Sequence, residues 1–316
     1  MKVKFVDSFF AREQTMGVLN ELFENVEISD DPDFVFCSVD YKAEHMNYDC
    51  PRIMVIGENI VPDFNCIDYA VGFNYMNFED RYLRVPLYNF YVDDYKLAIR
   101  RHIDYKRDDN KKFCNFVYSN GRNAIPERDS FFADLSKYKQ VDSGGRHLNN
   151  IGGSVDDKRE FQKQYKFSIA FENAVSRGYT TEKIIQAFSA GTIPIYYGNP
   201  LVAKEFNSKA FINCHEFGSF DEVIDKVKEI DSNPDLYDSM MREPIFTDID
   251  DRQDSLKDYR KFIYNICSQE SDKAIRRCDD CWGGKIQREK KRCYRFLTST
   301  EGNGLKARVI RKLTEI

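Results

Sequence analysis

The chain has 316 residues, of which 42% are hydrophobic and 31% charged, the balance of a soluble protein large enough for two domains. Its formal net charge of −5 excludes general binding of nucleic acid by the chain as a whole. Residues 1–6 do not form a signal peptide and no stretch approaches the roughly 20 apolar residues of a membrane-spanning helix, so we expect a cytoplasmic protein with reduced cysteines.

Short strands and helices alternate through residues 1–105 and predict a first Rossmann-like domain. We expect strands at 3–6, 34–37, 52–56, 67–72 and 80–88, and a helix at 11–23. The third strand ends in Gly57-Glu58-Asn59, which places a carboxylate at the carboxyl end of a strand. The polar, highly charged stretch 99–112 is predicted to connect this domain to the next.

A second Rossmann-like domain is predicted over residues 106–267. We expect strands within 112–120, 141–145, 167–171 and 192–197, and helices at 126–138, 161–165, 219–230 and 255–267. The predicted fold class is therefore α/β, with two Rossmann-like domains that face a cleft, followed by a basic segment at 268–316.

The stretch 167–200 carries the strongest pattern, which is strand, loop, helix, strand. Thr180 is a plausible N-cap of its helix, and Gly191 is suited to end it. Glu182 and Lys183 stand in the first helical turn, where a helix N-terminus can face an anion. A carboxylate there can accept sugar hydroxyls and a lysine can neutralise phosphate, so the pair indicates a nucleotide-sugar donor.

This stretch resembles the α-1,3/4-fucosyltransferases of bacterial type. The resemblance rests on Phe171-Glu172-Asn173, Gly178-Tyr179, Thr181-Glu182-Lys183-Ile184 and the run 192–198, in this order and at the spacing of the family. It implies an inverting, GDP-fucose-dependent glycosyltransferase of the two-Rossmann (GT-B) architecture. The implied reaction moves L-fucose to a GlcNAc or glucose hydroxyl, with α-1,3 linkage as the first expectation. The implied acceptor is a glycan such as N-acetyllactosamine or a lipopolysaccharide or capsular oligosaccharide.

Glu58 is the candidate catalytic residue, because Gly57-Glu58-Asn59 resembles the Gly-Glu-Asn of the first domain of the family. Inverting sugar transfer needs a base that takes the proton of the acceptor hydroxyl. A carboxylate in a turn or at a helix cap is the alternative interpretation of Glu58.

The resemblance also implies a set of donor-binding residues. These are Arg128, Asn173, Tyr179, Glu182 and Lys183, with Arg122 as a fallback for Arg128. Arg128 and Lys183 would hold the diphosphate of GDP, on which negative charge grows as it leaves. A surface salt bridge is the alternative for Arg128, and a packing role is the alternative for Tyr179.

No cofactor is expected to be required, although a divalent cation could stimulate transfer. Asp248-Ile249-Asp250 has the form of a manganese motif from another glycosyltransferase fold, and we interpret it as incidental. Cys267, Cys278, Cys281 and Cys293 are either free thiols or a loosely spaced zinc site. Two other functions stay open: a non-catalytic carbohydrate- or nucleotide-binding protein of the same fold, and a transferase that uses another nucleotide sugar.

The C-terminal segment is basic, in contrast to the acidic chain. Residues 285–312 hold ten lysines and arginines against two glutamates, and Leu305, Val309, Ile310 and Leu313 recur at helical spacing. This pattern is typical of a basic amphipathic helix on an anionic membrane, which would make the protein peripheral on the inner face. A surface helix with solvated charges is the alternative.

Overall fold

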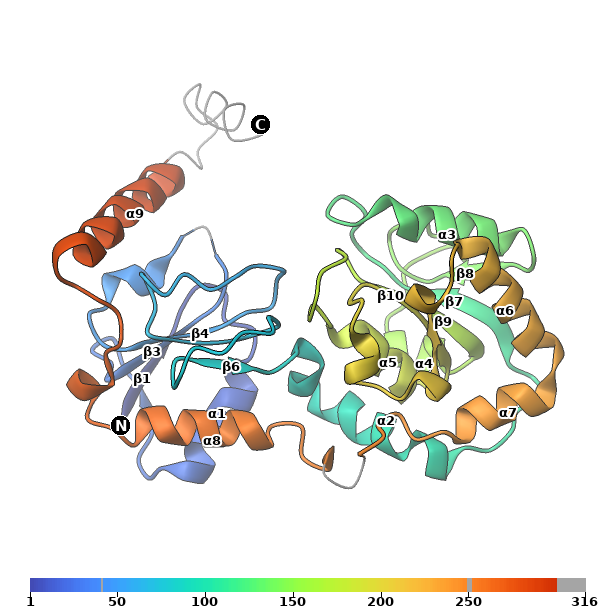
Figure 1. Cartoon of the computed structure of the whole chain (residues 1–316), viewed down its shortest axis with the longest axis horizontal. Coiled ribbons are helices and arrows are strands. Elements are labelled where there is room, and N and C mark those ends of the chain that lie inside the picture. The colour runs from blue at the N-terminus through green and yellow to red at the C-terminus, as the bar shows by residue number, and fades with distance from the viewer. Residues whose placement is uncertain (41, 249–251, 300–316) are drawn as a thin grey trace. The chain divides into compact units, whose positions relative to one another are not determined.

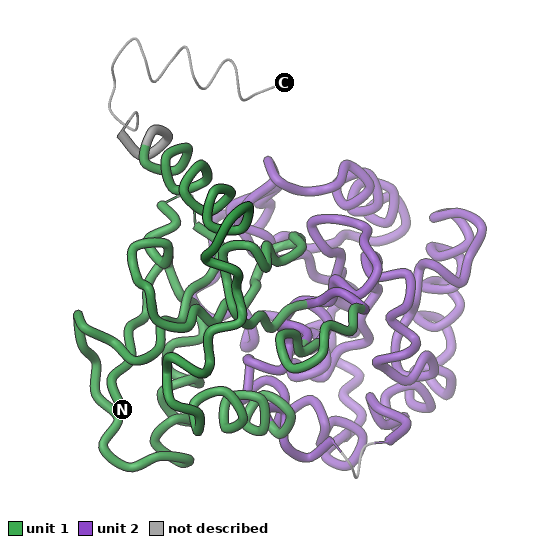
Figure 2. Tube along the Cα trace, turned by 60° about the vertical axis from the view of Figure 1, so that its left-hand side comes forward, with its two compact units in different colours: residues 1–72, 76–85, 257–316 green, residues 73–75, 86–256 purple. Residues whose placement is uncertain are grey.

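The computed structural model describes residues 1–40, 42–248 and 252–299, without the side chains of 296–299. Its chain divides into two compact units (Figures 1 and 2). Unit 1 comprises residues 1–72, 76–85 and 257–316, and unit 2 comprises residues 73–75 and 86–256. Within the described residues, no helix has both the length and the apolar character that crossing a membrane requires.

Unit 1 is built on a sheet of six parallel strands in the order β2-β1-β3-β4-β5-β6. The strands are β1 (Lys2–Phe5), β2 (Glu27–Ile28), β3 (Phe34–Cys37), β4 (Arg52–Val55), β5 (Tyr69–Gly72) and β6 (Tyr82–Arg84). Its helices include α1 (Arg12–Leu22), the 3-10 helix η1 (Glu44–Asn47), α8 (Lys257–Cys267) and α9 (Cys281–Ser299). Every residue of β3, β4 and β5 is buried, as expected for the middle strands of a parallel sheet covered on both faces.

The C-terminal part of the chain completes unit 1 through specific buried contacts. Tyr259 of α8 is fully buried and its hydroxyl lies 2.8 Å from Thr15 Oγ1 of α1. Asp68, just before β5, is fully buried and forms an ion pair with Arg277. The same carboxylate accepts hydrogen bonds from the backbone N–H groups of Arg276, Arg277 and Arg52, at 2.7 to 2.8 Å. A buried charge that is paired and hydrogen-bonded in this way fixes the 276–277 segment to the sheet.

Unit 2 is built on a five-stranded parallel sheet in the order β11-β10-β9-β7-β8. Its strands are β7 (Lys112–Phe116), β8 (Val141–Ser143), β9 (Tyr165–Phe171), β10 (Ile193–Tyr197) and β11 (Ile212–Asn213). Its helices are α2 (Val92–Asp104), α3 (Pro126–Ser136), α4 (Lys158–Gln162), α5 (Glu182–Ser189), α6 (Phe220–Ser232) and α7 (Pro234–Arg242). The predicted α/β class with two parallel sheets is confirmed.

The two faces of this second sheet bury different sets of side chains. Phe167, Ile169 and Phe171 of β9 belong to a core with α3 and α6, whereas Ala170 belongs to a core with α2 and α5. This alternation along one strand follows from the two-residue period of side chains in a β-strand. Because both faces of the sheet are covered by apolar cores, polar side chains are found at the carboxyl ends of the strands.

The unit boundaries differ from those predicted at residues 105 and 267. The stretch 99–112 was expected to be a connection, but residues 92–104 form α2, which packs on α5 inside unit 2. Its buried Tyr95, Ala98 and Ile99 form an apolar face that the many charges of the segment conceal in the sequence. Helix α8 was expected in the second domain, yet it belongs to unit 1.

The C-terminal segment contains one helix that was not predicted and one predicted helix that the structure does not describe. The described part of the basic segment includes the helix α9, which was not predicted. The predicted amphipathic membrane helix with Leu305 and Leu313 lies outside the described residues.

Candidate functional site

Polar residues of the central stretch follow the carboxyl ends of strands in the five-stranded sheet of unit 2. The strands and helices of this unit are labelled in Figure 1. β9 ends at Phe171 and is followed by Glu172, and β10 ends at Tyr197 beside it. The loop 172–181 then leads into α5, whose first residues are Glu182 and Lys183. The strand-loop-helix-strand pattern predicted for this stretch is confirmed, so a helix N-terminus and two strand ends converge at this edge.

Glu172 and Lys183 form a buried ion pair at this edge. Glu172 is 0% exposed, and its Oε2 lies 3.3 Å from Lys183 Nζ. The N-cap residue of α5 is Thr181, one residue after the predicted Thr180. Thr181 donates to Glu172 from its backbone N–H at 2.7 Å and from its Oγ1 at 2.6 Å. Gly198 makes room for the carboxylate, because a Cβ there would lie 2.4 Å from Glu172 Cγ. The carboxylate therefore joins the end of β9 to the start of α5.

Lys183 has three oxygen neighbours within reach of its ammonium group. Besides Glu172, its Nζ donates to Thr181 Oγ1 at 3.0 Å and to Glu182 Oε1 at 3.3 Å. Burial lowers the pKa of Lys183, but the carboxylates of Glu172 and Glu182 outweigh burial and raise the pKa far above its ordinary value. Lys183 is therefore a fixed positive charge at neutral pH.

The two carboxylates beside Lys183 differ in electrostatic environment. Burial raises the pKa of Glu172. Burial also acts to raise the pKa of Glu182, but Lys183 and Lys158 outweigh it and the pKa of Glu182 is lowered. Lys158 of α4 donates to Gln186 Oε1 at 2.7 Å, and burial lowers its pKa. Glu182, which is partly exposed, is thus an ionised acceptor at the rim of the group.

Arg128 lies in the first turn of α3 and is 0% exposed. Its Nη1 donates to Asn173 Oδ1 at 3.1 Å, its Nη2 donates to the Asn120 carbonyl at 2.7 Å, and its guanidinium stacks 4.2 Å from the Tyr118 ring centroid. Only two of its five N–H donors are in hydrogen bonds with described residues. The structure thus brings together Arg128 and Asn173, two of the predicted donor-binding residues.

Tyr118 stacks with Arg128 and is also within the electrostatic influence of Lys183. Its hydroxyl lies 3.0 Å from the carbonyl oxygens of Ile169 and Phe171, which places it beneath the end of β9. Burial raises the pKa of Tyr118, and the positive charges of both Arg128 and Lys183 act in the opposite direction. Arg128 and Lys183 therefore lie within electrostatic reach of one buried phenol. An arrangement of two cations at converging strand ends can hold a diphosphate.

The loop before α5 is shaped by Gly178. Its φ of +88° and a Cβ clearance of 2.2 Å to the Phe73 carbonyl oxygen restrict the position to glycine. Tyr179 is 2% exposed, and its ring packs edge-on against Phe73 with centroids 4.9 Å apart. This environment fits the packing alternative for Tyr179. Its role as a donor contact stays a prediction.

Two buried side chains below this loop were not singled out from the sequence. Asn199 donates from Nδ2 to Glu205 Oε1 at 2.7 Å and to Thr180 Oγ1 at 3.0 Å, and its Oδ1 accepts from Gly178 N at 2.8 Å. The sequence placed Glu172 only within the Phe171-Glu172-Asn173 motif of the family resemblance, and no role was predicted for it. The signal available for Glu172 was the polar pair Glu172-Asn173 directly after a strand that is almost entirely buried. The hydrogen-bond partners of Asn199 lie within 21 residues of it in the sequence, but they follow no known motif.

Glu58 lies in unit 1, in a bend after β4. Its side chain is exposed, and its carbonyl accepts a hydrogen bond from Ile60 N at 2.8 Å. The predicted position after the carboxyl end of an apolar strand is therefore observed. Its role as a base stays a prediction.

The described residues include one group of side chains that could hold a metal ion. The one group of three His, Cys, Asp or Glu donors consists of Asp7, Cys37 and His45 in unit 1. Asp7 Oδ1 accepts from Glu44 N at 2.6 Å, and Oδ2 accepts from His45 N at 3.1 Å and lies 2.5 Å from His45 Nδ1. These contacts already use the carboxylate to hold the start of η1, which gives the group a structural explanation.

Two metal motifs considered from the sequence gain no support. Cys267 is buried in α8, whereas Cys278, Cys281 and Cys293 are exposed, and the four do not form a group among the described residues. Asp248 is paired with Arg252 Nε at 2.7 Å, and residues 249–251 lie outside the described part.

Comparisons with known proteins place the two halves of the chain in one family. Residues 2–91 match a family described as the alpha-(1,3)-fucosyltransferase FucT N-terminal domain, and residues 107–299 match glycosyltransferase family 10 (fucosyltransferase), C-terminal part. A solved alpha1,3-fucosyltransferase with GDP-fucose is 30% identical, with a TM-score of 0.71 over 88% of this chain and 92% of that one. Another structure of an alpha1,3-fucosyltransferase has a TM-score of 0.74 at 30% identity, over 89% and 93%.

Curated relatives are matched over a shorter part of their length. Alpha-(1,3)-fucosyltransferase FucT of Helicobacter pylori is 39% identical over 224 residues, which are 61% of this chain and 46% of the relative. GDP-fucose protein O-fucosyltransferase 3 of Homo sapiens is 30% identical over 185 residues, which are 53% of this chain and 38% of the relative. The chain thus spans less than half of the length of these curated relatives.

Proposed function

Because the chain belongs to glycosyltransferase family 10, the fucosyltransferases, we propose that it transfers L-fucose from GDP-fucose to a hydroxyl group of a glycan. The observation that carries the proposal is the carboxyl edge of unit 2, where Lys183 is held as a permanent cation by Glu172 and Arg128 retains free donors. Such an edge suits the diphosphate of a nucleotide sugar. A relative of the same fold was solved with GDP-fucose.

The arrangement around Lys183 suggests how donor binding changes the site. An ammonium group has three N–H donors, and those of Lys183 face Thr181, Glu182 and Glu172. A diphosphate oxygen that enters must take the place of one of these acceptors. Glu182 is the partner at the rim, so Lys183 exchanges Glu182 for phosphate. The ionised Glu182 carboxylate is then available to accept hydroxyl groups of the sugar.

The reaction that we propose is a single displacement with inversion at the anomeric carbon. Glu58 takes the proton of the acceptor hydroxyl while that oxygen attacks, and GDP leaves. Arg128 and Lys183 stabilise the negative charge that develops on the diphosphate, and Asn173 keeps the Arg128 guanidinium in place through its 3.1 Å hydrogen bond. No step requires a metal ion. The proposed acceptor is a GlcNAc or glucose residue in α-1,3 linkage, within N-acetyllactosamine or a lipopolysaccharide or capsular oligosaccharide.

The test of this function is GDP release from GDP-fucose, measured with and without N-acetyllactosamine. An enzyme releases GDP faster when the acceptor is present, and mass spectrometry finds a product heavier by one fucose. Nucleotide affinity without acceptor-dependent release, across a panel of glycan acceptors, would identify a binding protein of the same fold instead. Release from a different nucleotide sugar in place of GDP-fucose would reassign the donor.

Replacing Lys183 or Arg128 with alanine should weaken GDP binding. Each change removes one charged donor from the diphosphate, and charge-assisted hydrogen bonds contribute about 1.5–3 kcal/mol, which corresponds to roughly tenfold to a hundredfold in affinity. Isothermal titration calorimetry with GDP measures the loss, and an unchanged stoichiometry shows that the variants are folded. The matched control is Arg107→Ala, because Arg107 is an exposed cation just before β7, at the opposite edge of the same sheet.

The comparison with Arg122 decides which arginine acts. Arg122 is exposed in the loop before α3 and carries the same charge as Arg128. Normal GDP affinity in Arg128→Ala, together with a loss in Arg122→Ala, would transfer the diphosphate role to Arg122.

A further inference from the structure

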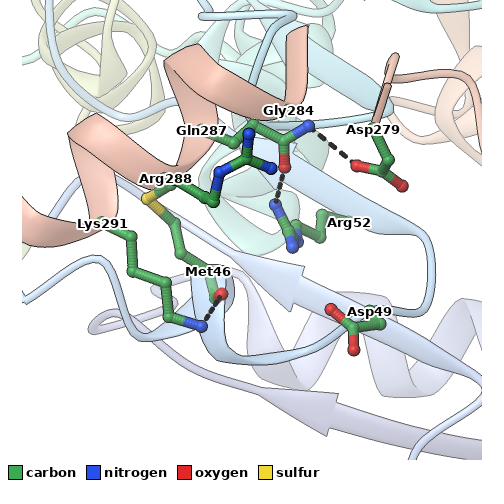
Figure 3. Close-up of a pocket in the computed structure, with 8 residues that line it drawn as sticks. All are labelled: Met46, Asp49, Arg52, Asp279, Gly284, Gln287, Arg288 and Lys291. Atoms are coloured by element: carbon green, nitrogen blue, oxygen red, sulfur yellow. Dashed lines mark hydrogen bonds between the residues drawn. The ribbon is translucent and has the colours of Figure 1, made fainter. Parts of the chain in front are cut away.

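Unit 1 contains a pocket of about 360 Å³ between η1, the start of β4 and the first turns of α9 (Figure 3). Three basic residues line it: Arg52 at the start of β4, and Arg288 and Lys291 on α9. Arg288 and Lys291 are three residues apart on one helix, which places them on the same face. Figure 3 shows Arg288 above Arg52 and Lys291 to the left of it, with the Lys291 ammonium group directed to the Met46 carbonyl.

None of these three cations has a carboxylate partner within 4.0 Å in the part of the chain that the structure describes. Arg52 is only 3% exposed and donates to the carbonyl oxygens of Tyr48 at 2.9 Å and Cys66 at 2.8 Å. Its Nη1 also donates to Gln287 Oε1 at 3.3 Å, and its Nη2 has no partner among the described residues. Lys291 Nζ donates to the Met46 carbonyl at 2.8 Å. Arg288 makes no hydrogen bond or ion pair with the described residues.

The pocket is lined by three positive charges, and neither of its two carboxylates forms an ion pair with any of the three among the described residues. Burial and the positive charges of Arg295 and Arg52 lower the pKa of Lys291, against the opposite effect of the Asp49 carboxylate. Two carboxylates line the pocket, but one of them, Asp279, is already held by Arg277 Nε at 3.3 Å and Gln287 Nε2 at 2.8 Å. The other, Asp49, is exposed to solvent. Burial and the positive charge of Arg277 lower the pKa of Arg52, against the opposite effect of the Asp68 and Asp279 carboxylates, neither of which forms an ion pair with its guanidinium. A buried arginine without a direct carboxylate partner is stabilised by an anion that binds it.

Gly284 keeps the pocket open on the side of α9. A Cβ at this position would lie 2.1 Å from the Asp279 carbonyl oxygen and 3.1 Å from Arg288 Nη1. Any side chain there would displace the turn that starts α9 and would press on the Arg288 guanidinium. The absence of a side chain at position 284 therefore preserves both the turn and access to the cations.

The pocket is separate from the proposed base. Arg52 begins β4, whereas Glu58 follows the carboxyl end of the same strand. At about 3.3 Å per residue, the six residues from 52 to 58 span up to roughly 20 Å along the chain. The pocket therefore belongs to the amino-terminal edge of the sheet of unit 1, the edge opposite to the one at which Glu58 stands.

We propose that this pocket is a binding site for a phosphate group, with Arg288 and Lys291 as direct ligands and the unpartnered Nη2 of Arg52 as a third donor. Guanidinium and ammonium groups converging on one opening are the donors that phosphate oxygens use in proteins. The phosphate can belong to a soluble phosphate or to the headgroup of an anionic lipid. The inference concerns unit 1 alone and does not depend on the transferase function.

The test compares the full chain with two double variants that remove the same charge from α9. Arg288→Gln/Lys291→Gln removes the two direct ligands. Lys285→Gln/Arg292→Gln removes two cations of the same helix that do not line the pocket, of which Arg292 is paired with Glu289. Calorimetric titration with inorganic phosphate and pyrophosphate measures soluble phosphate. Co-sedimentation with phosphatidic acid vesicles, with phosphatidylcholine vesicles as the neutral reference, measures the lipid source.

The pocket variant should bind the phosphate probe at least about tenfold more weakly than the wild type, while the control variant binds it normally. Any phosphate that binds in unit 2 binds equally in all three proteins, so a difference in affinity between them measures binding in the pocket. In the absence of probe, the pocket variant should melt at the same temperature as the wild type or higher, because it has lost unpaired like charges. Equal affinity of all three proteins for every probe, or equal losses in both variants, would overturn the proposal.

Discussion

Glu58→Gln should lower fucosyl transfer by at least about 100-fold and leave the affinity for GDP-fucose almost unchanged. Glutamine keeps the size and the hydrogen-bonding capacity of the side chain but cannot accept the acceptor proton, and general-base catalysis contributes about 10²- to 10⁴-fold. Steady-state kinetics with the donor and an acceptor measures kcat, and calorimetry measures donor binding. The loss should appear in kcat, because Glu58 lies in unit 1 and the diphosphate ligands lie in unit 2.

The matched control for this prediction is Glu24→Gln. Glu24 is an exposed glutamate of the same unit, just beyond the end of α1, so the change in charge is the same at a position without a proposed role. Near-normal turnover in Glu58→Gln would remove Glu58 as the base. Equal losses in both variants would indicate an effect of net charge rather than of proton transfer.

Glu172→Ala should destabilise unit 2 by about 3–5 kcal/mol. The substitution leaves Lys183 without its fully buried partner, and removal of one member of a buried ion pair has an effect of about this size. It also removes the acceptor for the N–H and Oγ1–H groups of Thr181, which hold the start of α5 to the end of β9. Differential scanning calorimetry and urea unfolding followed by circular dichroism measure the loss.

Glu182→Ala is the comparison that isolates the effect of burial. Glu182 lies as close to Lys183 Nζ as Glu172 does, at 3.3 Å, but its side chain is 21% exposed. We expect its removal to lower the free energy of unfolding by less than about 1 kcal/mol while it weakens donor binding. If Glu172→Ala and Glu182→Ala had the same small effect on unfolding, the buried pair would not be what fixes α5.

The central stretch was predictable because local patterns determine most of it. An apolar run of strand length, a glycine in the loop, a threonine before the helix and a glycine after it specify strand, loop and helix within 30 residues. The structure has these elements as β9, α5 and β10. The positions of Glu182 and Lys183 in the first turn followed from the same pattern, since a first turn is a few residues after its cap.

Other buried residues that sequence reasoning missed depend on long-range neighbours. Arg101 of α2 is buried because its Nη1 donates to the Thr192 carbonyl at 3.1 Å and its Nη2 to the Met240 carbonyl at 3.0 Å. These acceptors are 91 and 139 residues away, so the arginine looked like one more charge of a solvated connection. The pocket of Arg52 and Arg288 was hidden for the same reason, because β4 and α9 meet only in the folded unit.

The interleaved order of the two units has a consequence for synthesis on the ribosome. Tyr259 against Thr15 and Arg277 on Asp68 show that the sheet of residues 1–85 is completed by segments after residue 256. At about 5–20 residues per second, the interval between emergence of residue 85 and of residue 277 is roughly 10–40 s. During this interval all residues of unit 2 are synthesised, while the Asp68 carboxylate has not yet formed its ion pair with Arg277. A polypeptide arrested near residue 256 should therefore carry a folded unit 2 and a protease-sensitive unit 1.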